Sequence, residues 1–452
     1  MRISGLFNAR NVKFRWFFAA RSASLFGSNA APIALAFAVL EASHRSGDLG
    51  LVLAARSFAL ILLVLFGGVL SDRYPRDRVV LVGHLGAAAT QAVAATILIT
   101  GHFDLVAIMA TEALNGALTA LTGPGLYGMI GQVAPEGQVR KANALLGSTR
   151  QVATILGPSL GGLLVVTAGG GWALVLDAGC FLVAACCLAQ LRLPKAGPEH
   201  PGGVFAELRE GYGEFRTHTW IWTVVVGFAG LVFVQAGAWD VLGPVLAERS
   251  FGAQGWGLVL ASEAMGFLVG NLVMYRLHIV KLMRLGQLCL VLTPLPLVPM
   301  ALGAGLDWLL AASFFAGALF SVFGVAWDTS MQEHVPEEKL SRVASFDALG
   351  SWIAMPLGQV AALPLADFAG ISCYLWAGAA VWCAMAVWPL FVPSLWHLEH
   401  GASKLGANSE GAHQPRGPMS AAEPADIGRS VGLTPLGPAT SSAASPDRPP
   451  RR

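Results

Sequence analysis

Charged side chains are scarce in this chain. Of its 452 residues, 12% are Asp, Glu, Lys or Arg and 55% are hydrophobic, and the mean hydropathy is +0.60. A soluble domain usually carries roughly 25% charged residues, so the composition excludes a soluble protein and indicates an integral membrane protein. The apolar runs also lack a period-two alternation, so we expect the bilayer to be crossed by α-helices.

Motifs for chemistry are missing as well. The six cysteines lie in or beside apolar runs without the spacing of metal ligands, so we expect neither disulfides nor a metal site. The sequence contains no P-loop, no Ser-His-Asp arrangement and no nucleic-acid-binding module. We therefore expect no ATP-driven machine, no enzyme, no cofactor and no nucleic-acid partner.

Long apolar runs are what the chain has instead. A helix needs roughly 20 apolar residues to cross a hydrocarbon core of ~30 Å. The length up to residue 393 holds twelve such runs, which predicts an all-α membrane protein with twelve transmembrane helices. The runs span 16–41, 49–71, 79–100, 104–131, 142–167, 171–191, 220–247, 255–275, 282–303, 306–330, 343–366 and 371–393.

The runs fall into two groups of six. An N-terminal half (1–191) and a C-terminal half (220–393) flank a polar linker at 192–219. Apolar residues at helical spacing over 204–215 predict an amphipathic helix in this linker, on the inner membrane face. Residues 394–452 are rich in Ala, Ser, Pro and Gly, which predicts a disordered cytoplasmic tail.

An internal repeat supports this division. Pro135-Glu136, followed by Arg140, returns about 200 residues later as Pro336-Glu337, followed by Arg342. A duplication of this kind predicts two pseudo-symmetric six-helix halves, with substrate handled near the midplane where the halves meet.

Basic residues lie almost entirely on one side of the predicted membrane. The loops assigned to the other side contain only Arg45 and Arg249. By the positive-inside tendency, the basic side and both termini are cytoplasmic, as in a multi-pass protein of the cell membrane. The basic loop residues are Arg73, Arg76, Arg78, Arg140, Lys141, Arg192, Lys195, Arg209, Arg216, Arg276, Lys281, Arg284, Lys339 and Arg342.

The most specific motif is the loop at 67–78, GGVLSDRYPRDR. Its Gly68, Asp72, Arg73 and Arg76 resemble the loop motif of the major facilitator superfamily. The resemblance implies a conformational gate in which the carboxylate engages neighbouring helix ends and arginines. Charge alone would also be explained by contact with water.

Two residues depart from the family's loop motif. Pro75 stands where the family usually has glycine, and Asp77 stands where it usually has a second basic residue. In the second half, Gly270 is the position equivalent to Gly68, and the Asp-Arg pair that would come after it is missing. The gate is therefore expected to be asymmetric.

A second motif, LGPSLGGLL, lies in the fifth run. Its Gly157, Pro158, Gly161 and Gly162 allow close helix packing and a bend. Simple packing would explain them. The run also resembles the fifth-helix signature of antiporter members of the superfamily. Together with the sequence around Arg56 and the repeated second-half loop, it resembles the subfamily of macrolide-efflux and enterobactin-type siderophore exporters.

Ionisable residues within the runs are functional candidates, because each costs roughly 2.5–3.5 kcal/mol at the bilayer centre. Arg150, Asp328 and Asp347 lie near the inner helix ends, where salt bridges of a gate are expected. Aromatic residues, such as Trp239, Trp256 and Trp352, could line a cavity or anchor the chain at the interface. The candidates for binding substrate or protons are Asn29, Arg56, Glu112, Asp240 and Glu263.

The resemblance implies a secondary transporter of major facilitator fold. We expect it to export a hydrophobic drug-like or siderophore-like molecule by proton antiport and alternating access, as a monomer in the bilayer. A nutrient importer or facilitator of the same fold, or a non-transporting membrane sensor or scaffold, are the alternatives. The identity of the substrate and the direction of transport stay open.

Overall fold

The computed structural model describes residues 11–135, 138–193, 213, 216–217, 219–276, 281–335 and 337–396, and all regular elements in these ranges are helical. The predicted linker helix at 204–215, apart from Gly213, and the tail after residue 396 lie outside the described residues.

Six helices form the first half. They are α1 (Val12–Ser43), α2 (Ser46–Arg73), α3 (Arg76–Ile99), α4 (Leu105–Val133), α5 (Val139–Ala168) and α6 (Gly170–Leu188). The second half contains α8 (Thr219–Val234), η2 (Gln235–Val241), α9 (Leu242–Glu248), α10 (Gly252–Arg276), α11 (Leu282–Val291), α12 (Leu297–Leu302), α13 (Leu306–His334), α14 (Glu337–Trp352), α15 (Met355–Ala369), α16 (Ile371–Val387), η3 (Trp388–Phe391) and α17 (Pro393–Trp396).

Apolar length accounts for most of these elements. Within the described ranges, 11 helices are long and apolar enough to cross a membrane. The start of α4 shows side-chain capping: the Asp104 carboxylate accepts hydrogen bonds from the backbone N–H groups of Val106 (2.8 Å) and Ala107 (3.1 Å). The twelfth predicted span, 282–303, is present as two shorter helices.

Two predicted continuous helices of the second half are interrupted by turns, and a third contains a π-helical segment. The 282–303 run divides into α11 and α12 around a turn that contains Pro294 and Pro296. The 343–366 run breaks between α14 and α15, just before Pro356. Proline lacks a backbone N–H and clashes with the preceding turn, so helices end at these positions. The 220–247 run contains the π-helix η2, which hydropathy does not reveal.

The turns repeat between the two halves. Gly101 before α4 and Gly303 before α13 have φ of 71° and 63°, and Gly169 after α5 and Gly370 after α15 have φ of 92° and 87°. Residues with a side chain rarely adopt a positive backbone φ, so glycine is required at these turns. The matched positions show that the sequence repeat is also a structural one.

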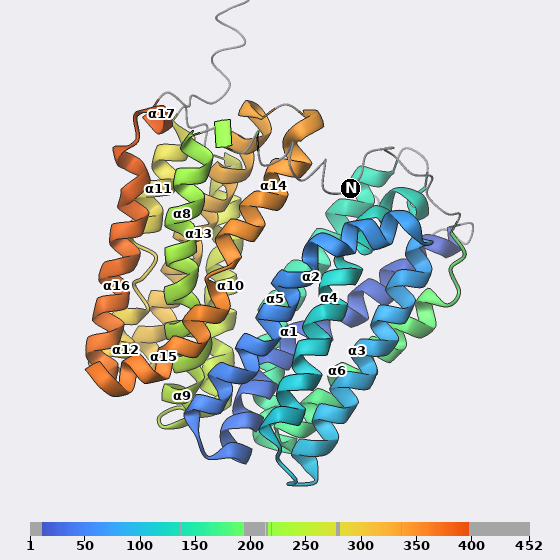
Figure 1. Ribbon diagram of the computed structural model, residues 1–452, viewed down its shortest axis with the longest axis horizontal. Helices are drawn as coiled ribbons and strands as arrows, with labels where there is room; N and C mark the ends of the chain where they lie inside the picture. Colours follow the sequence, from blue (N-terminus) through green and yellow to red (C-terminus); the bar gives the residue numbers. More distant parts are fainter. Residues whose placement is uncertain are drawn as a thin grey trace, which may run out of the picture. The chain divides into compact units, whose positions relative to one another are not determined.

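The two halves pack side by side and meet most closely at one end (Figure 1). There, Gly50 of α2 faces the backbone of Gln359 in α15, and Gly162 of α5 faces the backbone of Ala253 in α10. We call this the closed end; it carries the turns at Gly169 and Gly370. Toward the other end, the open end, the helices of the two halves diverge (Figure 1).

Candidate functional site

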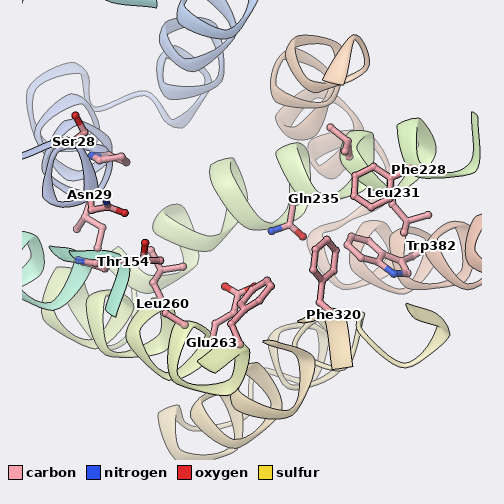
Figure 2. A pocket seen from close by; sticks show the side chains of 16 residues that line it. Ser28, Asn29, Thr154, Phe228, Leu231, Gln235, Leu260, Glu263, Phe320 and Trp382 are labelled. Atoms are coloured by element: carbon pink, nitrogen blue, oxygen red, sulfur yellow. The ribbon is translucent and has the colours of Figure 1, made fainter. Parts of the chain in front are cut away.

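A cavity of about 440 Å³ lies where the two halves meet. Figure 2 shows Ser28, Asn29 and Thr154 of the first half on one side, and Phe228, Phe320 and Trp382 of the second half on the other. Gln235 and Glu263 lie between these two groups (Figure 2). The cavity therefore combines a polar wall with an aromatic wall, as expected of a site for a mostly apolar ligand.

A second hollow of about 490 Å³ adjoins the first and shares Pro32, Ile33, Val232, Gln235 and Leu260 with it. It extends the site toward α2, η2 and the junction of α14 and α15. Its other polar and aromatic lining residues are Arg56, Ser57, Trp239, Asp240, Trp256, Trp352 and Gln359. The two hollows together are called the central cavity.

Four of the five predicted substrate or proton residues reach the central cavity: Asn29 and Glu263 line the first hollow, and Arg56 and Asp240 line the second. The Asn29 amide donates to the Leu25 carbonyl at 2.7 Å within its own helix, which leaves its amide oxygen available. Glu112 does not line the cavity. It lies behind Arg56 and is 1% exposed.

Arg56 and Glu112 form an ion pair between α2 and α4. Arg56 Nη1 lies 3.2 Å from Glu112 Oε2, and the arginine side chain is 23% exposed. Gly116, one turn after Glu112, lets the backbone of α2 at Arg56 approach α4 closely. The pair thus carries a buried carboxylate whose charge is balanced by a guanidinium at the cavity wall.

Asp177 of α6, which the sequence also marks as a carboxylate within a span that could bind a proton, extends this buried polar group. Its side chain is 2% exposed, and it interacts electrostatically with both Arg56 and Glu112. Gly27 of α1 packs directly against it. Its Oδ1 atom has no hydrogen-bond partner within the described residues. A carboxylate inside a predicted span was the available signal.

The π-helix η2 presents three side chains to the central cavity: Gln235, Trp239 and Asp240. A π-turn inserts an extra residue and rotates the side chains after it around the helix axis, and such segments are frequent at functional sites. The Trp239 ring packs on Trp256 of α10 with centroids 4.8 Å apart. Glu263 of α10 interacts with both Trp239 and Asp240, so the second-half candidates form one group.

Sequence reasoning missed Gln235 and Gln359. Both are amides inside apolar runs, and an uncharged amide costs less free energy to bury than a charge, so it gives a weaker signal in the sequence. Gln359 is 3% exposed, and its Oε1 has no hydrogen-bond partner within the described residues. A search for every polar residue within the spans would have found both.

The fifth-helix glycines lie where α5 contacts other helices. A Cβ on Gly161 would lie 2.5 Å from the Ala30 carbonyl oxygen of α1, and one on Gly157 would lie 2.5 Å from Asn29 Cβ. Gly162 faces α10, whose Gly257 in turn faces the Pro158 carbonyl. The motif therefore serves two contacts, one within the first half and one between the halves at the closed end.

The predicted gate is described only in part. The surroundings of Gly68 and the side chains of Asp72 and Arg73 lie outside the described part of the structure, although the backbone of these residues belongs to α2. Arg76 Nη1 donates to the Gly128 carbonyl of α4 at 3.0 Å. Asp77 is 7% exposed and accepts a hydrogen bond from the Leu193 backbone N–H at 3.3 Å. The departure from the loop motif thus ties α3 to the chain segment after α6.

Among the other inner-end candidates, Asp347 accepts hydrogen bonds from Trp327 Nε1 (3.0 Å) and Ser351 Oγ (3.2 Å). Asp328 interacts electrostatically with Asp347. Arg150 lies close enough to Arg21 of α1 for the two like charges to repel each other. In this conformation, no ion pair joins these basic and acidic residues within the described ranges.

A two-half helical membrane fold with a polar and aromatic cavity between the halves defines a transporter. The family model of the Major Facilitator Superfamily matches residues 17–359. The chain belongs to this superfamily and is an integral protein of a bacterial membrane that transports small molecules and is not an enzyme.

Curated relatives include exporters. The chain is 25% identical over 392 residues to the multidrug efflux pump Tap of Mycolicibacterium fortuitum, which covers 82% of this chain and 94% of the pump. It is 26% identical over 382 residues to the enterobactin exporter EntS of Escherichia coli, which covers 77% of this chain and 85% of the exporter. The resemblance to an efflux and siderophore-exporter subfamily is therefore confirmed.

Solved structures show the same fold. A peptide transporter POT superimposes with a TM-score of 0.67 at 13% identity, covering 86% of this chain and 96% of the transporter. A D-xylose-proton symporter superimposes with a TM-score of 0.64 at 14% identity, covering 84% and 98%. At these identities the likeness establishes the fold alone.

Proposed function

We propose that this chain exports a hydrophobic, drug-like or siderophore-like small molecule from the cytoplasm in exchange for protons, by alternating access and as a monomer. The observation that carries the proposal is the placement of Asp240 and Glu263 in the wall of the central cavity, between the two halves. Relatives described as a multidrug efflux pump and an enterobactin exporter favour the outward direction.

Orientation is inferred from the loop charges. Basic loops gather at the open end, and the positive-inside tendency places that end and both termini in the cytoplasm. The described conformation is then inward-facing. The closed end seals the cavity from outside through the glycine contacts of α5 with α10 and of α2 with α15.

In the proposed exchange, substrate and protons compete for the same groups. In the inward-facing state, Asp240 and Glu263 would release protons to the cytoplasm as substrate enters the cavity. After the halves rock, the O–H bonds would form again with protons from outside as substrate leaves. Because a carboxylate's proton affinity depends on solvation and on nearby charge, alternating exposure can change it.

The Arg56–Glu112 pair is the charged group opposite these carboxylates, and Asp177 lies behind it. We assign this cluster a supporting role, because Glu112 and Asp177 are buried and line neither hollow. The gate at Asp72 would hold the inner end closed in the opposite conformation.

Transport into inverted membrane vesicles tests the proposal. An acidified lumen is expected to drive uptake of at least one member of a panel of dyes, antibiotics and siderophores, and a protonophore is expected to abolish it. The double variant Asp240→Asn/Glu263→Gln should lower gradient-driven uptake about tenfold or more, because each step needs an ionisable group. Asp307→Asn, an exposed acid at the start of α13, is the matched control and should transport normally.

Three results would contradict the proposal. An uptake rate that is independent of the pH gradient would exclude proton exchange. Gradient-driven movement toward the cytoplasm would support the importer alternative. Ligand binding without flux in proteoliposomes would support a sensor.

A further inference from the structure

We infer that the second-half wall of the central cavity, made by Asp240, Glu263 and Gln359, binds the positive charge of a lipophilic organic cation. This inference rests on the proposed function and narrows its substrate class. This wall would bind molecules with an ammonium or phosphonium centre on an aromatic body in preference to anionic ligands.

Charge at the cavity wall is the first argument. Three charged residues line the two hollows: Arg56, Asp240 and Glu263. Arg56 is already paired with Glu112 at 3.2 Å. Within the described part of the chain, neither Asp240 nor Glu263 forms an ion pair. When both are ionised, the wall therefore holds two negative charges that only protons or a cationic ligand can balance.

Gln359 supplies an independent argument. It lies on α15, not on η2 or α10, and it lines the same hollow as Asp240. Its side chain is 3% exposed, and its Oε1 has no described hydrogen-bond partner. Buried carbonyl oxygens are almost always hydrogen-bonded, so this acceptor indicates a donor brought by a ligand. An N–H group of an ammonium ion meets the need of Gln359 and that of the carboxylates together.

Aromatic rings around these groups suit a cation of this kind. Trp239 and Trp256 pack at 4.8 Å between centroids beside Asp240. Phe228, Phe267 and Phe320 line the adjoining hollow beside Glu263. Ring faces attract cations and offer apolar surface to an aromatic body. An aromatic anion would gain the apolar contact alone, would be repelled by the ring faces and would face both carboxylates.

Other basic residues do not reverse this charge pattern. Arg21 and Arg150 interact with each other but line neither hollow. The remaining first-half polar groups at the cavity, Ser28, Asn29, Ser57 and Thr154, are uncharged. A ligand within the central cavity therefore meets unbalanced charge of negative sign only.

A pair of probes with one shape and opposite charge gives the test. Tetraphenylphosphonium and tetraphenylborate would be bound to the purified full-length protein in lipid nanodiscs, with empty nanodiscs as the blank. We expect saturable binding of the phosphonium only. The Asp240→Asn/Glu263→Gln variant should weaken it about tenfold or more, since the loss of two facing charges exceeds 1.4 kcal/mol at low dielectric. Asp307→Asn should bind as the unmodified protein does.

A second probe pair isolates Gln359. Quinidine, protonated on its tertiary amine, carries an N–H donor that its N-methyl quaternary derivative lacks. Gln359→Leu should weaken quinidine binding several-fold and leave the quaternary derivative and tetraphenylphosphonium nearly unchanged. Thermal unfolding of each variant in the same nanodiscs would separate loss of binding from loss of fold.

The inference is overturned if tetraphenylborate binds as well as or better than tetraphenylphosphonium, or if the double carboxylate variant keeps full phosphonium affinity. These measurements need no pH gradient. A protein that binds the phosphonium selectively but shows no proton-driven flux would retain the cation site while losing the proposed antiport, so the two failures are distinguishable.

Discussion

At the scale of single residues, the Arg56–Glu112 pair places charge in the interior of the first half. Glu112 is 1% exposed, and its compensation comes from a guanidinium that is itself 23% exposed at the cavity wall. Asp177 adds a second buried carboxylate to the same group. Removal of the arginine would leave two acids in a low-dielectric interior.

We therefore expect Arg56→Met to lower the free energy of unfolding by about 3–5 kcal/mol, the range for breaking one side of a buried pair. The double variant Arg56→Met/Glu112→Met should recover most of this loss, because no unpaired partner remains. Thermal unfolding in one detergent, analysed as a double-mutant cycle, measures the coupling. Equal losses of unfolding free energy in the single and double variants would show that the pair contributes to stability through packing alone.

At the scale of elements, small residues decide where the two halves touch. The α5 glycines bring α1 and α10 to within backbone contact, whereas Gly147 in the same helix has open space around it. This contrast within one helix separates a packing requirement from a general intolerance of larger residues.

Gly162→Leu should weaken the closed end, because its side chain would meet the backbone carbonyl of Ala253. Overpacking of this kind costs about 1–3 kcal/mol, so we expect a lower melting temperature and an uptake rate reduced about tenfold. Gly147→Leu should leave both unchanged. Matching effects at the two positions would argue against a specific α5–α10 contact.

The π-helix η2 is the second feature at this scale. It aligns Trp239 and Asp240 with Glu263 of α10, and Gly237 within it lies against the Tyr374 side chain of α16. Hydrogen bonding in the i to i+5 pattern leaves no trace in hydropathy, so only the coordinates reveal it.

At the scale of the whole molecule, the repeat is matched in its turns and unequal at its gate. The glycine turns at 101 and 303 and at 169 and 370 correspond, whereas only the first copy holds the Asp-Arg pair of the loop motif. Met274, in the second copy, is buried in the apolar core and Tyr275 is 87% exposed. A change at Met274 would therefore disturb packing. Tyr275 is exposed, so it is the better control for a variant of Asp72.

Asp72→Asn is expected to reduce transport to below about a tenth of the unmodified rate while leaving membrane insertion intact, because the gate would lose its charged acceptor. Tyr275→Phe should transport normally. Quantified protein in the membrane fraction, together with vesicle uptake, checks both statements. Full transport by the Asp72→Asn protein would refute the asymmetric gate.

Much of the fold could be predicted because lipid imposes one solution on apolar runs of sufficient length. The helix boundaries around Asp104 and the turn glycines depend on local chemistry that sequence displays. Pro294, Pro296 and Pro356 are also visible in the sequence, but hydropathy alone does not show that they interrupt an apolar run.

The candidate site was predicted only in part. Cost of burial identified Arg56, Glu112, Asp240 and Glu263 as candidates, because a charge inside a span is exceptional wherever it points. Hydropathy could not show that Glu112 lies behind Arg56, or that Gln359 lies beside Asp240. Those relations join helices far apart in the sequence.

By itself, the sequence determined the membrane-spanning helices, their duplication and the residues whose burial needs compensation, because hydrophobic length, turn geometry and charge cost are local properties. The tertiary structure alone decided which charges are balanced and which face the cavity. That outcome depends on the packing of α2 on α4 and of η2 on α10, and packing is a property of pairs of surfaces that no single segment contains.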